Sequence, residues 1–201
     1  MQTANTPSQW GAIHQAFHWT IGILVISQII VGLWFSGIDP KDPARGEAFA
    51  LHASLGLTLL LLMLGRLVWR LRNPVPELPD TLSPGQKRLA RATHWLFYIL
   101  VIGLPAGAYL AVSARGRPVP FWGLELPGII GKNDALADFI MAVHVAGAWA
   151  LIALILLHVA AALRHEFILK DNTLRRMTPL PLRAEANPAS VPGPRPGSRS
   201  H

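Results

Sequence analysis

The chain has 201 residues, of which 51% are hydrophobic and only 14% are Asp, Glu, Lys or Arg. Soluble domains carry about 25% charged residues, so this composition excludes an ordinary soluble enzyme, and its apolar content excludes a disordered protein. The formal net charge of +7 is expected to favour anionic lipid headgroups rather than nucleic acid, because the basic residues flank apolar segments.

Four segments, residues 1–37, 48–65, 92–114 and 139–163, contain no charged residue. A helix that spans a bilayer needs about 20 apolar residues. We therefore predict an all-α, integral membrane four-helix bundle over residues 1–179, with spans at about 17–36, 51–71, 93–112 and 139–163. The first basic residue is Lys41, so the first span lacks the basic leader of a secretory signal peptide and is expected to be retained.

The charges of the connecting segments predict the orientation in the membrane. The segments after the second and fourth spans hold ten basic and four acidic residues, whereas those after the first and third hold five basic and six acidic. An excess of Lys and Arg marks the cytoplasmic side. Both termini are therefore expected in the cytoplasm, with the chain in a bacterial inner membrane. Residues 180–201 are rich in Pro, Ser, Gly and Arg and predict a disordered cytoplasmic tail.

The chain has no cysteine, which excludes disulfides, thiolate metal sites, iron–sulfur clusters and covalently attached c-type haem. Ionisable residues within spans are costly and are candidates for function, so the histidines are the residues to consider. A single histidine in a helical bundle is commonly a hydrogen-bonded interface residue, so only the spacing of several histidines can indicate a cofactor site.

His144 and His158 lie fourteen residues apart in the fourth span. That spacing is about 21 Å along a helix and brings the second side chain back to within about 40° of the first. His52 opens the second span at the depth of His144, and His18 lies in the first span at the depth of His158. Imidazole suits iron, and helical bundles hold cofactors between facing helices. Two histidine pairs at two depths therefore predict two haem b groups.

Small residues accompany each of these histidines at helical spacing. Gly22, Gly56, Gly147 and Ala162 follow them by three or four residues, which places each on the same face as its histidine. They are expected to make room for the haem plates, although small residues are also common where membrane helices touch.

The other histidines have weaker claims. His94 opens the third span at the depth of His18 and His158, and it could replace either as a ligand. A place near a haem propionate or a quinone is the preferred interpretation. His14 is expected at or outside the inner interface and His165 just beyond the fourth span, while His201 lies in the tail.

Several stretches of the sequence resemble the bacterial cytochrome b561 family of four-helix, di-haem membrane proteins. They are FHW (17–19), LHASLG (51–56), GRLVWRLRNPVP (65–76), THWLFYILVIGLP (93–105), MAVHVAG (141–147) and LHVAAALRHEFILKDNTLRRMTP (157–179). The resemblance covers residues 13–179 and places the axial ligands at His18, His52, His144 and His158. It also implies electron transfer between the periplasmic side and the ubiquinone pool.

Two functions follow from the resemblance. The first is an oxidoreductase of the superoxide oxidase or quinone reductase type, in which Arg115, Arg117 and Lys132 are candidates for attracting an anion. The second is a haem-bearing anchor or relay subunit of a hydrogenase- or dehydrogenase-type complex, docked through residues 113–138. A structural membrane protein without a cofactor is the third, weaker alternative. The expected partners are membrane lipid, quinone and a redox partner protein, without nucleic acid.

Overall fold

A computed structural model describes residues 3–6, 9–78 and 82–178. Its elements, in order, are α1 (Ala12–Gly37), α2 (Ala44–Arg72), α3 (Pro84–Ala114), β1 (Val119–Phe121), β2 (Leu124–Leu126), α4 (Asp134–Arg164), the π-helix η1 (His165–Leu169) and the 3-10 helix η2 (Arg175–Met177). The predicted fold class is confirmed. The predicted tail from residue 180 lies outside the described residues.

The described part of the chain contains four helices that are long and apolar enough to cross a membrane. Each extends beyond the predicted span because polar caps and charged residues continue the helix past its apolar core. Ser83, for example, accepts a hydrogen bond from the Gln86 amide while the Gln86 side chain caps the Ser83 amide, with Pro84 in the first turn. Such a capping box satisfies amides that the first helical turn leaves free.

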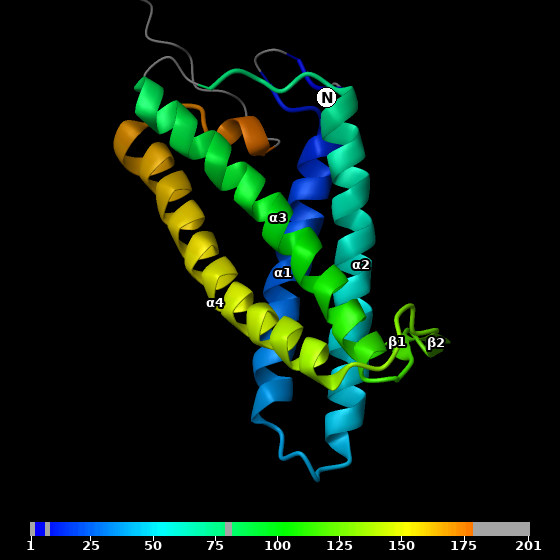
Figure 1. Ribbon diagram of the computed structural model, residues 1–201. Coiled ribbons are helices and arrows are strands. Elements are labelled where there is room, and N and C mark those ends of the chain that lie inside the picture. Colours follow the sequence, from blue (N-terminus) through cyan, green and yellow to red (C-terminus); the bar gives the residue numbers. More distant parts are fainter. Residues whose placement is uncertain (1–2, 7–8, 79–81, 179–201) are drawn as a thin grey trace, which may run out of the picture.

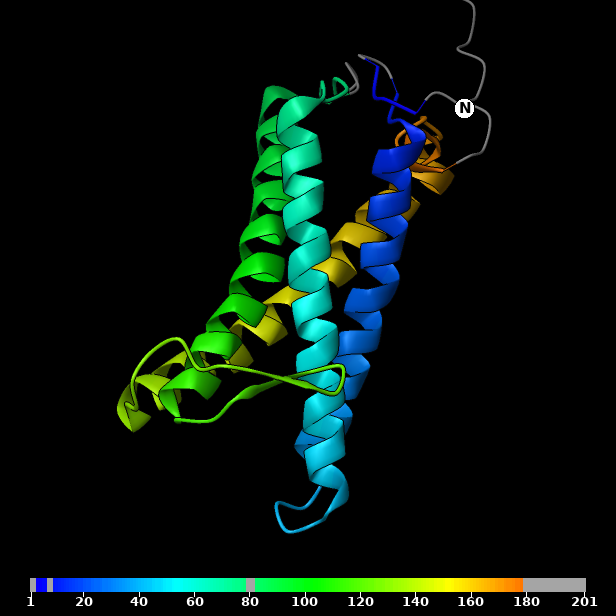
Figure 2. The ribbon, with the colours of Figure 1, turned by 90° about the vertical axis from the view of Figure 1, so that its right-hand side faces the viewer.

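The helices pack in chain order, α1 against α2, α2 against α3 and α3 against α4. Figures 1 and 2 show α1 and α2 side by side, with α4 crossing the bundle diagonally. A group of buried apolar residues lies between these helices and includes Leu59, Met63, Tyr98 and Val101. Large apolar side chains are also exposed around all four helices, which suits a lipid environment.

A two-stranded antiparallel hairpin follows α3, an element that the sequence pattern did not predict. It pairs Val119 with Leu126 and Phe121 with Leu124, and Figure 2 shows it lying across α2. The backbone amide of Trp122 donates to Ser54 Oγ at 2.9 Å, and its indole nitrogen donates to Thr58 Oγ1 at 3.0 Å. These bonds fix the hairpin to α2.

The opposite end of the bundle, where the described ends of the chain meet, is covered by three short segments. Asn5 donates to the Pro74 carbonyl at 2.9 Å, and Trp19 donates to the Met177 carbonyl at 2.7 Å. Arg176 donates to the Glu77 carbonyl at 2.8 Å. The N-terminal segment, the α2–α3 connection and the segment around η2 thus hold one another in place.

Candidate functional site

The structure brings four of the predicted histidines together as two pairs. His18 of α1 faces His158 of α4, with ring centroids 6.2 Å apart and ring planes at 65°. His52 of α2 faces His144 of α4, also at 6.2 Å, with ring planes at 73°. We call these the terminus-side pair and the hairpin-side pair. Both combine residues distant in sequence, in the pairing that the helical spacing predicts.

The separation within each pair fits two imidazoles on one metal ion. A metal–imidazole bond measures about 2 Å, and a ring centre lies roughly 1 Å from its nitrogens, so two axial rings have centroids about 6 Å apart. Among the described residues, no three His, Asp or Glu side chains converge as a metal site. Paired histidines therefore suit a metal that arrives with further ligands, as the iron of a porphyrin does.

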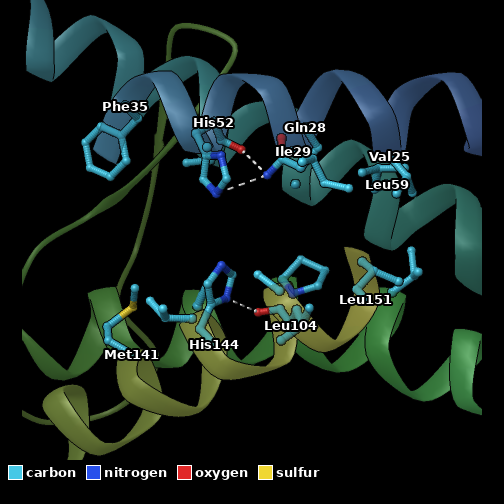
Figure 3. Close-up of a pocket in the computed structure, with 18 of the residues that line it drawn as sticks. Val25, Gln28, Ile29, Phe35, His52, Leu59, Leu104, Met141, His144 and Leu151 are labelled. Carbon is cyan, nitrogen blue, oxygen red and sulfur yellow. Dashed lines mark hydrogen bonds between the residues drawn. The ribbon is translucent and has the colours of Figure 1, made fainter. Parts of the chain in front are cut away.

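The hairpin-side pair lines a cavity of about 310 Å³. Its walls are mainly apolar and come from all four helices, with Val119 of the hairpin, only 2% exposed, adding to them. Figure 3 shows the rings of His52 and His144 pointing toward one another across this space. The cavity thus offers two facing nitrogen ligands in mainly apolar surroundings.

Hydrogen bonding prepares His144 to bind a metal. Its Nδ1 lies 3.1 Å from the carbonyl oxygen of Leu104 on α3. A carbonyl only accepts, so Nδ1 carries the proton and Nε2 keeps its lone pair. Donation from the second ring nitrogen to a carbonyl is a common way of orienting a metal-binding histidine.

His52 is held by α1. Gln28 Nε2 donates to the backbone oxygen of His52 at 2.9 Å and lies 3.2 Å from the ring Nε2. Gly32, one turn further along α1, leaves space for the ring, because a Cβ atom there would lie 2.9 Å from His52 Cε1. Neither residue is among the predicted site residues, although a glutamine within an apolar span is a usable signal.

The predicted small residues have different surroundings. Gly56 lines the cavity, but a Cβ atom there would come within 3.1 Å of Gln28 Nε2. Gly22 is exposed, and a Cβ atom there would meet nothing within 4 Å. Gly147 instead lies against α3, where a Cβ atom would come within 2.6 Å of Leu104 Cδ2. Ala162 is half-buried. The structure therefore gives Gly147 a role in helix packing and Gly56 a role in leaving room for Gln28, while the haem-packing roles of these residues stay predictions.

The terminus-side pair lies beside a second group of polar residues. Arg66 of α2 lies 3.4 Å from His18 Nδ1 and 3.5 Å from His14 Nε2. His14 was expected at or outside the interface, but it is 1% exposed and stacks on Trp10 at 3.9 Å. The N-terminal segment folds over the end of the bundle and covers His14, so its side chain is not solvated, while its depth relative to the membrane stays a prediction.

The remaining histidines lie outside both pairs. His94 is within electrostatic reach of Arg66, Arg70 and His158, as expected for its depth, but it faces neither ligand pair as a third ring. His165 Nδ1 lies 2.6 Å from Asp171 Oδ2. Its predicted place beyond the membrane core therefore holds a specific hydrogen bond to a carboxylate.

The candidate anion-attracting residues are largely paired. Arg115 lies 2.5 Å from Asp138 and 3.9 Å from Asp134, and Lys132 lies 3.6 Å from Asp134. Among the described residues, Arg117 is the one of the three candidates that forms no ion pair. The acidic partners of Arg115 and Lys132 weaken the attraction that these two cations exert on an anion. Arg117 is therefore the principal candidate for attracting an anion.

Comparisons with known proteins agree with this arrangement. The family model for prokaryotic cytochrome b561 matches residues 9–180. This chain belongs to the prokaryotic cytochrome b561 family. It is 35% identical to cytochrome b561 homolog 2 of Escherichia coli K12, over 88% of this chain and 95% of that protein. It is 34% identical to the probable superoxide oxidase CybB of Yersinia pestis, over 85% and 96% of the two chains.

A third relative, cytochrome b562 of Cereibacter sphaeroides, is 31% identical over 80% of this chain and 89% of its own. A cytochrome b561 is a multi-pass bacterial membrane protein of electron transfer, and the family implies haem b cofactors. The residues present fit that cofactor. Each histidine pair has the spacing of two ligands on one iron, and the cavity at His52 and His144 is mainly apolar.

The turn after α4 gives a prediction about acid stability. Asp171 accepts from the His165 ring, and its other oxygen accepts from the Thr173 amide at 2.9 Å. Burial acts to raise the pKa of Asp171, but the hydrogen bonds from His165 and Thr173 outweigh it and lower the pKa from its ordinary value of 3.8. A lowered pKa stabilises the fold above the unfolded value, and this stabilisation is lost as the pH falls through the folded value.

We therefore expect Asp171→Asn to reduce hydrogen-exchange protection of residues 165–173 at neutral pH, where the carboxylate normally accepts both bonds. Wild type and variant should converge below pH 3.8, once the exchange rates are corrected for pH. Glu125→Gln, in the hairpin, is the matched control and should leave this segment unchanged. Equal protection of wild type and Asp171→Asn at neutral pH would contradict the stabilising role of Asp171.

Proposed function

We propose that the protein is a di-haem b-type cytochrome in which His18 with His158 and His52 with His144 supply the axial ligands. The observation that supports this most strongly is the equal 6.2 Å separation of the two facing ring pairs. In this proposal electrons pass between a periplasmic donor, with superoxide as the candidate, and the ubiquinone pool of the respiratory membrane.

The side chains of the protein bind and orient the cofactor. When bound, each haem supplies a one-electron iron couple. His144 is oriented by Leu104, and His52 is kept in place by Gln28 and Gly32. The mainly apolar cavity walls lower the polarity around the pair, and this polarity together with hydrogen bonds to the ligands is how a protein sets a reduction potential. The two pairs lie at opposite depths, so the helix bundle provides a path across the membrane.

We also propose that both termini lie in the cytoplasm, because of the excess of Lys and Arg after α2 and α4. Reporter fusions after Asn172 and after Ser83 are expected to give a cytoplasmic signal, and a fusion at Asp42 a periplasmic signal. These three positions lie in connections or turns. A cytoplasmic signal at Asp42 would reverse the topology and place the hairpin-side pair near the cytoplasm.

Superoxide is the candidate donor because a relative carries the name of a probable superoxide oxidase. Oxidation of two superoxide anions yields two O₂ molecules and two electrons, which with two protons reduce ubiquinone to ubiquinol. An anionic substrate is attracted by positive charge, and salt screens that attraction over about 8 Å at physiological ionic strength. Arg117 is exposed and is the cation best placed to act in this way.

We expect Arg117→Gln to slow haem reduction by superoxide severalfold at low salt and to flatten its dependence on ionic strength. Stopped-flow absorbance measures both, with haem spectra recorded to confirm that the site is intact. The matched control is the double variant Arg115→Gln and Asp138→Asn, which removes an ion pair without changing the net charge. Its rate should equal that of wild type.

The second candidate function, an anchor or relay subunit, is favoured by exposed apolar side chains on the loop after α3. Trp122 is 55% exposed and Leu124 is 62% exposed, which suits a docking surface for a redox partner. A relay subunit should be reduced slowly by superoxide without a systematic salt effect, and rapidly when its partner enzyme is present. Slow reduction of the wild type at low salt would favour this function over the oxidase.

A further inference from the structure

Arg66 is a cation inside the bundle without an acidic partner among the described residues. Its guanidinium contacts two ring nitrogens, His18 Nδ1 at 3.4 Å and His14 Nε2 at 3.5 Å, and lies 5.8 Å from the ring centre of Tyr98. Its Nε atom is buried without a hydrogen-bond partner. An arginine within a membrane protein is costly unless it is paired, and a guanidinium has five donors but no acceptor. The site therefore holds more positive charge and more donors than the described residues satisfy.

Binding of a metal by His18 removes one of the two acceptors. A neutral imidazole has one nitrogen with a free lone pair and one that carries a proton. The lone pair is used by the metal, so His18 Nδ1 then either bonds to the metal or carries the proton. In both cases it no longer accepts from Arg66. If His18 binds the metal, the Arg66 guanidinium therefore loses this hydrogen-bond acceptor, and another acceptor beside the cofactor would have to replace it.

We propose that Arg66 binds a carboxylate of the haem held between His18 and His158. This inference rests on the proposed function, and it adds a binding residue that neither the ligand spacing nor the family comparison provides. Haem b carries two propionate groups, and arginine binds carboxylates through paired, charge-assisted hydrogen bonds. Burial strengthens that interaction, because the N-terminal segment, His14 and Trp10 keep water from this end of the bundle.

Arg70, one helical turn from Arg66, provides a matched control. Its guanidinium lies over the rings of Trp95 at 5.5 Å and Tyr98 at 5.6 Å. Among the described residues, it makes no hydrogen bond with a histidine ligand, yet replacing either arginine with glutamine removes one positive charge from the same end. If the arginines act only through their positive charge, both variants should show effects of similar size. If Arg66 contacts a carboxylate, Arg66→Gln should show a larger effect than Arg70→Gln.

The first measurement is a spectroelectrochemical titration of the haem-loaded, full-length protein, with haem content determined in parallel. Positive charge beside a haem favours the reduced form, so Arg66→Gln should lower the potential or the occupancy of the terminus-side haem more than Arg70→Gln does. Arg66→Lys should lie closer to wild type because it keeps the charge. The haem at His52 and His144 should be unchanged in all three variants and serves as an internal reference.

The second measurement uses the full chain prepared without haem and loaded with either haem b or its dimethyl ester, which lacks both carboxylates. At the terminus-side site the wild type should bind the ester roughly tenfold more weakly than haem, whereas Arg66→Gln should bind the two about equally. Equal discrimination by wild type and Arg66→Gln would overturn the inference. Absence of a terminus-side haem from the wild type would instead overturn the proposed function, so the two failures are distinguishable.

Discussion

Replacing His52 or His144 with alanine is expected to remove the same haem, and replacing His18 or His158 the other. Each variant should retain half of the haem present in the wild type, which is expected to hold two haem b groups per chain. The reason is that each pair offers only two protein ligands, 6.2 Å apart, so loss of one ring leaves the iron without one axial bond. Pyridine haemochrome analysis measures the content, and low-temperature absorption spectra identify which haem is missing.

The control is His94→Ala, which changes a histidine at the depth of the terminus-side pair without touching either facing ring pair. It should retain both haems. A wild type with one haem per chain, a variant of His52 that differs spectrally from the variant of His144, or loss of a haem from His94→Ala would each contradict the pairing. The same preparations test whether the protein is a cytochrome at all, since a chain without absorption bands would be a structural protein.

The helices and the depth of each histidine could be predicted from the sequence, because both follow from the geometry within a single helix. A membrane helix has a fixed rise and a fixed turn per residue, so the fourteen-residue spacing of His144 and His158 determines their depths and common face. His18 and His52 could then be assigned to the two depths from their places in the spans. The 6.2 Å separations agree with these assignments. The assignments depend on how far each residue lies along its helix and not on the rotamer of its side chain.

The contacts around the ligands could not be predicted in the same way. The bond from His144 to the Leu104 carbonyl and the contact of Arg66 with His18 join residues that are separated by forty positions or more in the sequence. The first depends on how α3 and α4 cross, the second on how α1 and α2 cross, and both on which rotamers the packing allows, and no periodicity encodes either. The burial of His14 likewise depends on a contact between the N-terminal segment and the α2–α3 connection.

Gly32→Ala is expected to remove most of the haem from the hairpin-side pair while leaving the terminus-side haem in place. A Cβ atom at residue 32 would lie 2.9 Å from Cε1 and 3.3 Å from Nδ1 of His52. The first distance is too short for a stable contact, so the ring must move, and Gln28 holds the same residue from the next turn of α1. A metal ligand must stay within about 0.5 Å of its productive position, so this displacement weakens the axial bond.

Gly103→Ala is the matched control for that substitution. Gly103 lies within α3, and a Cβ atom there would meet nothing within 4 Å. Both variants exchange a helical glycine for alanine, which by itself stabilises a helix by about 0.5–1 kcal/mol, so any difference between them arises from the contact with His52. Haem content and the absorption bands of both variants provide the comparison. If Gly32→Ala keeps both haems with wild-type spectra, the ring of His52 does not need the space that Gly32 leaves, and the hairpin-side site is not built as the structure describes.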